Sequence, residues 1–175
     1  MKKGIALFLA VAMILTIFMP FNSYAQTNYD KQLKDAIIKC KKLFEITDEY
    51  DKFSSDVSSY NNKTYFDFNW LDSKGKLGNI KITTLSDGTI VSYEKNKPYY
   101  EDKSSGLPKI TKKDGLKISK EFINKVNPDF LNNIFYVEND HPLVPNDSEF
   151  NYYFIRSEYG VPYYDNNINI FIDNN

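Results

Sequence analysis

Two short residue patterns recur at the same separation in this sequence, and this internal repeat constrains the fold more than any other feature. Tyr65-Phe66 returns as Tyr153-Phe154, and Asn79-Ile80-Lys81-Ile82 returns as Asn167-Ile168-Asn169-Ile170, both 88 residues later. A recurrence of this kind is typical of a supersecondary unit that occurs twice along a chain. The sequence therefore predicts two units of one architecture.

The first unit begins with an amphipathic helix. Between residues 29 and 45, apolar side chains recur at spacings of three and four, which places them on one stripe of a helix. Cys40, the one cysteine of the chain, lies on this stripe. Because a thiol in apolar surroundings ionises poorly, Cys40 is expected to be a buried structural residue. No internal disulfide is possible, so packing must stabilise the fold.

Strands are predicted after this helix, because the apolar period changes to two. Residues 53–60 are predicted to form a strand ahead of them. Asp87-Gly88 is typical of a tight hairpin turn. Residues 89–94 are therefore predicted to form the last strand, with Val91 and Tyr93 on one face. The buried positions of the two strands between are predicted to be Phe66, Phe68, Trp70, Ile80, Ile82 and Thr84.

A polar, proline-interrupted stretch over residues 98–110 predicts a linker between a first unit at 26–97 and a second unit at 111–175. Thr111 and Asp114 have the spacing of a shortened capping box, which marks the start of a second helix. The buried stripe of this helix is predicted to consist of Ile118, Phe122, Ile123 and Val126.

The second helix is expected to end at Asn127-Pro128, because proline disfavours helical geometry in the residue before it. Strands are predicted over residues 134–137, 150–159 and 163–172. In the first unit the isoleucine strand precedes a hairpin and one more strand, whereas in the second it reaches Asp173 and the sequence stops. The predicted fold class is α+β: two tandem helix-plus-antiparallel-sheet repeats, the second lacking its last strand.

The first 25 residues have the pattern of a secretory signal peptide. Lys2 and Lys3 precede an uncharged apolar run over 4–19, and Ser23 and Ala25 occupy the positions where cleavage requires small residues. Cleavage is expected between Ala25 and Gln26, and it predicts a secreted or extracytoplasmic, envelope-associated protein. A retained amino-terminal anchor is the alternative. Membrane contact is expected through this segment alone.

The 175-residue chain is poor in the residues that most catalytic and metal sites use. It contains one Cys, one His and one Arg, and its formal net charge is −1 without blocks of basic residues. A nucleic-acid-binding surface needs concentrated positive charge, so nucleic acid is not an expected partner. Aromatic residues make up 16% of the chain, so Phe and Tyr are expected to form much of the core.

Each residue with catalytic or binding potential has a simpler structural interpretation. His141 lies in a loop by composition and has no second His or Cys to complete a metal site or a triad. The neighbouring carboxylates lie in polar stretches, where the burial that tunes a catalytic acid is not expected. We assign no catalytic, cofactor-binding or metal-binding residues. The carboxylates considered are Asp48, Glu49, Asp51, Glu138 and Asp140.

Two further groups of polar residues invite a binding interpretation. Asp165, Asn166, Asn167 and Asp173 offer oxygen ligands, but no calcium-loop pattern occurs and turn chemistry explains them better. Tyrosine pairs could form a carbohydrate- or peptide-binding face, although in a strand one ring of each pair is normally buried and the other exposed. These pairs are Tyr99-Tyr100, Tyr152-Tyr153 and Tyr163-Tyr164.

These features together resemble the YcdB/YcdC-type repeated domain of exported proteins from Gram-positive bacteria, a relative of the PepSY domain. The helix, the aromatic strand, the isoleucine strand, the Asp87-Gly88 turn and the strand ending in Ser92-Tyr93 follow one another as in a family repeat. Asn127-Pro128-Asp129 is similar to the family's Asn-Pro-Asp segment, and Gly160-Val161-Pro162 is similar to its Gly-Ile-Pro hairpin. The resemblance covers nearly all of residues 30–173.

The resemblance implies an exported, non-catalytic module with PepSY-like repeats, and the PepSY kinship implies inhibition or chaperoning of a secreted peptidase. We therefore expect an interaction module that needs no cofactor and binds a secreted peptidase or an extended peptide. Strand addition to the incomplete second sheet would be its natural mode. Two alternatives remain: a carboxylate-dependent enzyme acting on envelope material, and a truncated remnant of a longer protein, because family members continue past the second repeat.

Overall fold

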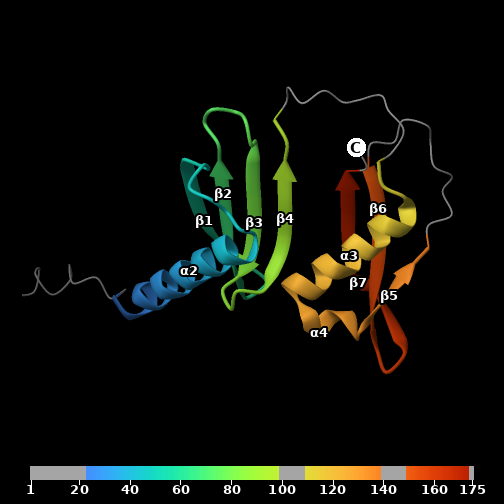
Figure 1. Ribbon diagram of the computed structural model, residues 1–175. Coiled ribbons are helices and arrows are strands. Elements are labelled where there is room, and N and C mark those ends of the chain that lie inside the picture. Colours follow the sequence, from blue (N-terminus) through green and yellow to red (C-terminus); the bar gives the residue numbers. More distant parts are fainter. Residues whose placement is uncertain (1–22, 99–108, 139–148, 174–175) are drawn as a thin grey trace, which may run out of the picture.

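The computed structural model describes residues 23–98, 109–138 and 149–173, which form two helix-plus-sheet units lying next to each other (Figure 1). The fold class is α+β, as the repeat predicts. The first unit contains one helix and four strands. These are α2 (Ser23–Leu43), β1 (Lys52–Tyr60), β2 (Lys63–Leu71), β3 (Asn79–Leu85) and β4 (Ile90–Asn96).

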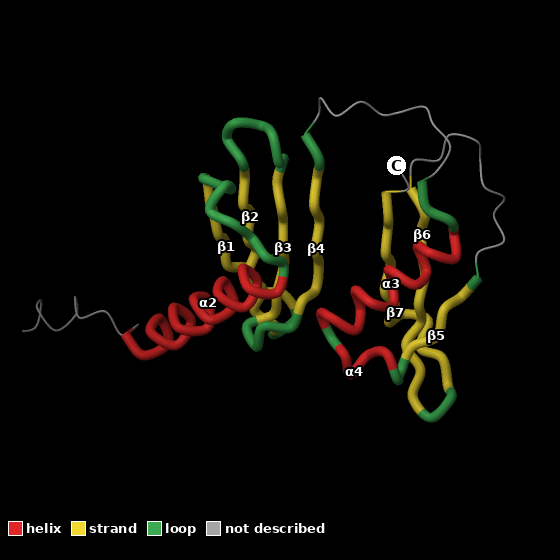
Figure 2. Tube along the Cα trace, viewed as in Figure 1, coloured by secondary structure: helices red, strands yellow, loops and turns green. Residues whose placement is uncertain are grey.

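The second unit has the same order with one strand fewer in the described part of the chain. Its elements are α3 (Lys112–Val126), the short α4 (Pro128–Leu131), β5 (Ile134–Val137), β6 (Glu149–Glu158) and β7 (Val161–Asp173). Both sheets are antiparallel, with strand orders β1-β2-β3-β4 and β5-β6-β7 (Figure 2). By order and by the sequence repeat, β6 corresponds to β2 and β7 corresponds to β3.

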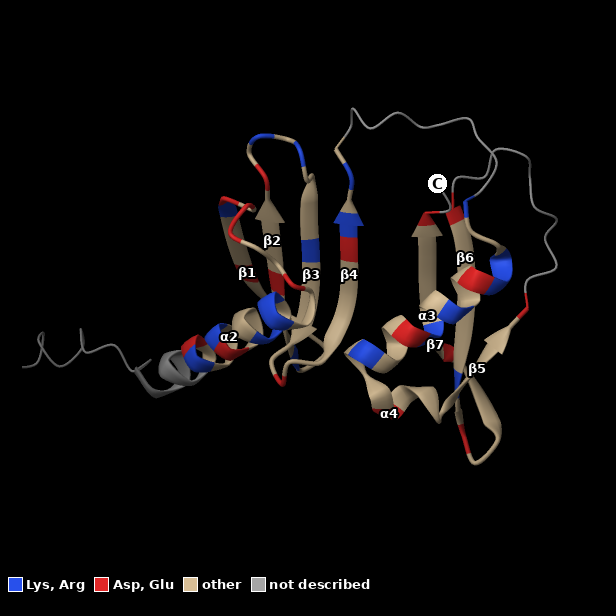
Figure 3. Ribbon diagram, in the orientation of Figure 1, with Lys and Arg blue, Asp and Glu red and all other residues tan. Residues whose placement is uncertain are grey.

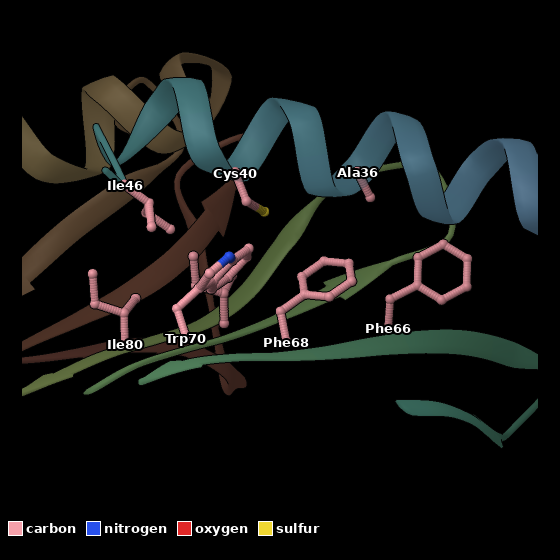
Figure 4. Packing of buried hydrophobic residues seen from close by; sticks show 8 residues of the cluster. Ala36, Cys40, Ile46, Phe66, Phe68, Trp70 and Ile80 are labelled. Carbon is pink, nitrogen blue, oxygen red and sulfur yellow. The ribbon is translucent and has the colours of Figure 1, made fainter. Parts of the chain in front are cut away.

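The helix α2 covers one face of the first sheet. Phe66, Phe68 and Trp70 on β2 are at most 3% exposed, as the period of two predicts. Ala36 and Cys40 point from α2 toward these rings (Figure 4). Burial raises the pKa of the Cys40 thiol to about 11, which keeps the thiol protonated. The prediction that Cys40 is a buried structural residue is confirmed.

The helix α3 approaches the second sheet closely at Gly115. The hydroxyl of the fully buried Tyr152 donates a hydrogen bond to the Lys112 carbonyl at 2.8 Å. A Cβ at Gly115 would lie 2.1 Å from that hydroxyl oxygen, so the close approach requires glycine. Gly115 therefore sets how near α3 lies to β6.

The predicted capping box at the start of α3 is present. The Asp114 N–H donates to Thr111 Oγ1 at 3.1 Å, and the Thr111 N–H donates to the Asp114 carboxylate at 3.2 Å. The helix ends at Val126, where Asn127 precedes Pro128, as predicted. Local sequence signals therefore account for both ends of α3.

The first helix differs from its predicted range of 29–45. Within the described residues it extends from Ser23, six residues before Tyr29, and no proline or glycine interrupts this added stretch. It ends at Leu43, since Glu45 adopts a left-handed φ of 53° that no helix interior allows. The apolar stripe placed the middle of α2 correctly and its ends only roughly.

The prediction that Val91 and Tyr93 share a face is wrong. Thr83 pairs with Ser92, whereas Thr84 pairs with Ile90, so Val91 is the extra residue of a β-bulge. Ile90 therefore packs against the core together with Tyr93, and Val91 is 53% exposed.

Several features predicted from the sequence lie outside the described residues. They include the apolar run of the leader, the linker residues 99–108 with the pair Tyr99-Tyr100, and the loop with Asp140 and His141. Within the described ranges, neither long helix is apolar enough to cross a membrane.

Candidate functional site

The outer edge of β7 has no neighbouring strand in the part of the chain that the structure describes. On its inner side β7 pairs with β6, from Glu149 opposite Asp173 to Glu158 opposite Val161. Its counterpart β3 has neighbours on both sides, β2 and β4. β7 therefore presents a row of backbone N–H and C=O groups of the kind that β3 uses to bind β4.

The second core is also partly uncovered along β7 in the part of the chain that the structure describes. Ile80 and Ile82 on β3 are 3% and 1% exposed, whereas Ile168 and Ile170, at the repeated positions on β7, are only half-buried. In the first unit, side chains of β4 pack over this part of the core. We refer to the unpaired backbone of β7, together with Ile168, Ile170 and Ile172, as the open edge.

The open edge lies beside β4 of the first unit. Lys97, directly after β4, forms an ion pair with Asp173 at the end of β7, with Nζ and Oδ2 2.6 Å apart. The carboxyl ends of the two strands are therefore close together, and both strands run in the same direction (Figure 1). Among the described strands β4 pairs with β3 alone, so two unpaired strand edges lie on either side of this region.

The helix α3 lies in front of the open edge and contacts both units. It packs on β6 and β7, and the centroid of its Phe122 ring lies 5.5 Å from the Tyr93 ring on β4. The Phe122 ring also lies 6.2 Å from the ring of Phe44, which follows α2 and stacks on Tyr93 at 4.3 Å. This aromatic cluster of Phe44, Tyr93 and Phe122 holds the second helix against the first sheet.

Ile118 lies one helical turn before Phe122, on the side of α3 that faces the first unit. The sequence predicts a buried position, but Ile118 is 43% exposed, so this prediction is wrong. The physical reason is that no described strand lies beneath this flank of the helix. No motif in the sequence indicates a binding role for Ile118 or Phe122, because their exposure depends on which strands lie beneath α3.

Charge contributes little to the open edge. Lys, Arg, Asp and Glu are dispersed over both units and are sparse on β7 (Figure 3). The solvent-facing positions of β7 include Asn167, Asn169 and Phe171, of which Phe171 is 63% exposed. Burial raises the pKa of Tyr93, so this nearby phenol is neutral. A ligand of the open edge would therefore be held by backbone hydrogen bonds and apolar contacts.

Of the carboxylates named in the sequence analysis, those that the structure describes lie in both units and do not form one site. Asp48 and Glu49 accept hydrogen bonds from neighbouring side chains at the surface, and Asp51 accepts one from the Ser73 N–H at 2.8 Å. Glu138 is exposed at the end of β5. Over residues 23–98, 109–138 and 149–173, no group of His, Cys, Asp and Glu could hold a metal ion.

The tyrosine pairs behave differently from one another. Tyr152 is fully buried and Tyr153 is partly exposed, as sheet packing predicts. Tyr163 and Tyr164 are both exposed. A register shift in β7 places residues 164–166, which include Tyr164, outside the ladder, since Ile155 pairs with Asn167 and Arg156 pairs with Tyr163. The hairpin therefore presents two exposed rings near the start of β7.

A shallow hollow of about 270 Å³ lies on the face of the first sheet that α2 does not cover. Its polar side chains include Asp67, which accepts a hydrogen bond from Thr83 Oγ1 at 2.6 Å. Since this carboxylate is already bonded within the sheet, the open edge is the stronger candidate for a binding site.

Comparison with known proteins gives one family. A family model described as the YcdB, YcdC repeated domain matches residues 33–175. Searches of curated proteins and of solved structures give no match. The matched range spans both units, including α3 and the open edge.

Proposed function

The chain belongs to the YcdB/YcdC repeated-domain family, and on this premise we propose that it is an exported, non-catalytic interaction module of the cell envelope. Its ligand is an extended peptide segment, which it binds by adding a strand to the open edge. A secreted peptidase is the partner class that the PepSY kinship suggests. The amino-terminal pattern of Lys2, Lys3, an apolar run and Ala25 supports export.

One observation carries this proposal: equivalent isoleucines are buried beside β4 in the first unit and half-buried along the open edge in the second. A peptide in extended conformation would satisfy both deficits of β7, because its backbone would pair with the unpaired N–H and C=O groups while alternate side chains cover Ile168 and Ile170. The strand β4 shows that the repeat architecture accommodates such a neighbour.

Peptide binding tests the proposal directly. The probe is a fluorescently labelled peptide that copies residues 89–95, the strand that covers the first core, and fluorescence anisotropy measures its binding to the purified protein. We expect saturable binding. A peptide of the same composition in scrambled order should bind about tenfold more weakly or not at all, because its apolar side chains lose the spacing with which Ile90 and Tyr93 cover the first core.

A matched pair of protein variants locates the binding site. Ile170→Ser on the open edge should weaken binding about tenfold, since it removes apolar area from the contact. Val57→Ser changes an exposed apolar residue on β1, the edge strand at the far side of the first sheet, and should leave binding unchanged. Circular dichroism checks that both variants fold. Failure of the native-order peptide to bind would refute the proposed function.

Export has a separate test. Expressed with its leader in a bacterial host, the protein should accumulate outside the cytoplasm with Gln26 as its first residue, as amino-terminal sequencing would show. Retention of Met1 in a membrane fraction would instead indicate an uncleaved anchor.

A further inference from the structure

We propose that the bound segment inserts between β7 and β4, pairs with both strands, and joins the two sheets into one. This inference rests on the proposed function and adds a second binding edge, on the first unit. Both edges lack a partner among the described strands. The ion pair between Lys97 and Asp173 holds the ends of these two strands together without making them hydrogen-bonded neighbours.

The direction of the strands favours insertion. β4 runs antiparallel to β3, so a strand that takes the equivalent place beside β7 runs antiparallel to β7. Because β4 and β7 run in the same direction, that strand would be antiparallel to β4 as well (Figure 1). One orientation of the segment therefore gives antiparallel pairing on both sides, the more stable form of ladder.

The apolar surroundings indicate which side chains the segment carries. In the first unit Tyr93 lies opposite Ile82, the counterpart of Ile170 on the open edge. The segment would therefore place an aromatic or β-branched side chain opposite Ile170, on the face covered by α3. There it would contact Ile118, whose 43% exposed side chain lies on the flank of α3 toward the first unit.

The opposite face of the segment would be polar and need not be charged. In the first sheet Lys81 and Glu94 lie opposite each other across β3 and β4, with Nζ and Oε2 3.9 Å apart. The position equivalent to Lys81 on β7 is Asn169, which carries no charge. The preferred ligand is thus an extended segment with apolar side chains on the face toward α3 and polar side chains, charged or uncharged, on the opposite face, flanked by two strands.

Two N-methylated forms of the peptide copying residues 89–95 distinguish insertion from simple edge addition. Alternate amides of a strand point to opposite neighbours, so methylation of every second amide blocks pairing on one side only. Insertion predicts that both methylated sets bind at least about tenfold more weakly than the unmodified peptide, since each set removes pairing with one edge.

The outcomes separate the inference from the proposed function. If one methylated set binds as well as the unmodified peptide, the segment adds to a single edge, and the insertion is wrong while the proposed function stands. If neither set is weakened, the peptide does not bind as a strand. If the unmodified peptide itself does not bind, the proposed function and the inference both fail.

Variants of two exposed isoleucines give a second readout. Ile118→Asp should weaken binding of the unmodified peptide by at least about tenfold. The inserted strand would lie beneath α3 and bury this side chain, so a charged group here would lose its contact with water. Ile38→Asp is the matched control: Ile38 is 55% exposed on α2 and should have no effect. Equal binding by both variants would exclude a strand beneath α3.

Discussion

At the residue scale, Gly115 shows how the absence of a side chain sets the distance between a helix and its sheet. We expect Gly115→Ala to lower the free energy of unfolding by about 1–3 kcal/mol, because a Cβ would overlap the buried Tyr152 ring. The gain of about 1 kcal/mol in helix propensity offsets this loss only partly. Urea denaturation measures the change, with Lys120→Ala on the exposed face of α3 as the control. A more stable Gly115→Ala variant would contradict the close approach.

At Thr84, in contrast, a substitution is expected to raise the free energy of unfolding. Its hydroxyl oxygen is fully buried and has no hydrogen-bond partner, so Thr84→Val should raise the free energy of unfolding by about 1 kcal/mol. The adjacent Thr83 donates to Asp67 at 2.6 Å, and Thr83→Val should be destabilising. Thermal denaturation of the two variants makes the comparison. Loss of stability in Thr84→Val would mean that the hydroxyl is bonded in solution.

The Cys40 thiol makes the free energy of unfolding depend on pH in the alkaline range. Burial raises the pKa of its thiol from 9.0 to about 11, so the folded protein keeps a proton that the unfolded chain loses. The contribution of this group to stability is therefore complete below pH 9 and falls as the pH rises toward about 11. Urea denaturation across this range should show a steeper loss in the native protein than in Cys40→Ala. Parallel curves would show that the thiol is not buried.

At the scale of elements, the sequence predicts the type of each strand and helix well, because local patterns decide it. The period of two on β2 and the capping box at Thr111 depend on neighbouring residues only, and both are confirmed. The side on which Val91 lies depends on a bulge opposite Thr84, which no local pattern encodes. Residues whose environment is set by another element are therefore the ones that the sequence misplaces.

For the candidate site, too, the sequence predicts some features and misses those that depend on contacts between elements. The repeat predicts that the second sheet lacks its last strand, and this is enough to place the open edge on the second isoleucine strand. It does not predict that Phe122 reaches Tyr93 across the two units, nor that Lys97 pairs with Asp173. Such contacts depend on how the units pack, which a helical or strand period does not describe.

At the scale of the whole molecule, the aromatic cluster of Phe44, Tyr93 and Phe122 couples the two units. Phe122→Ala should lower the free energy of unfolding by about 1–3 kcal/mol, less than for a fully buried ring because Phe122 is half-buried. Scanning calorimetry should also show a broader transition or two transitions, since the units would unfold more independently. The control is Phe130→Ala, a 40% exposed ring on α4. A sharp, unshifted transition in Phe122→Ala would argue against this coupling.

The central claim is that β7 has an open edge that a partner strand completes, and hydrogen exchange followed by mass spectrometry tests it most directly. In the protein alone, the amides of β7 should exchange faster than those of β3, because β3 is paired on both sides. Addition of the peptide copying residues 89–95 should slow exchange in β7, and in β4 if the segment inserts. Equal protection of β7 and β3 in the protein alone, or no change in β7 with saturating peptide, would contradict the claim.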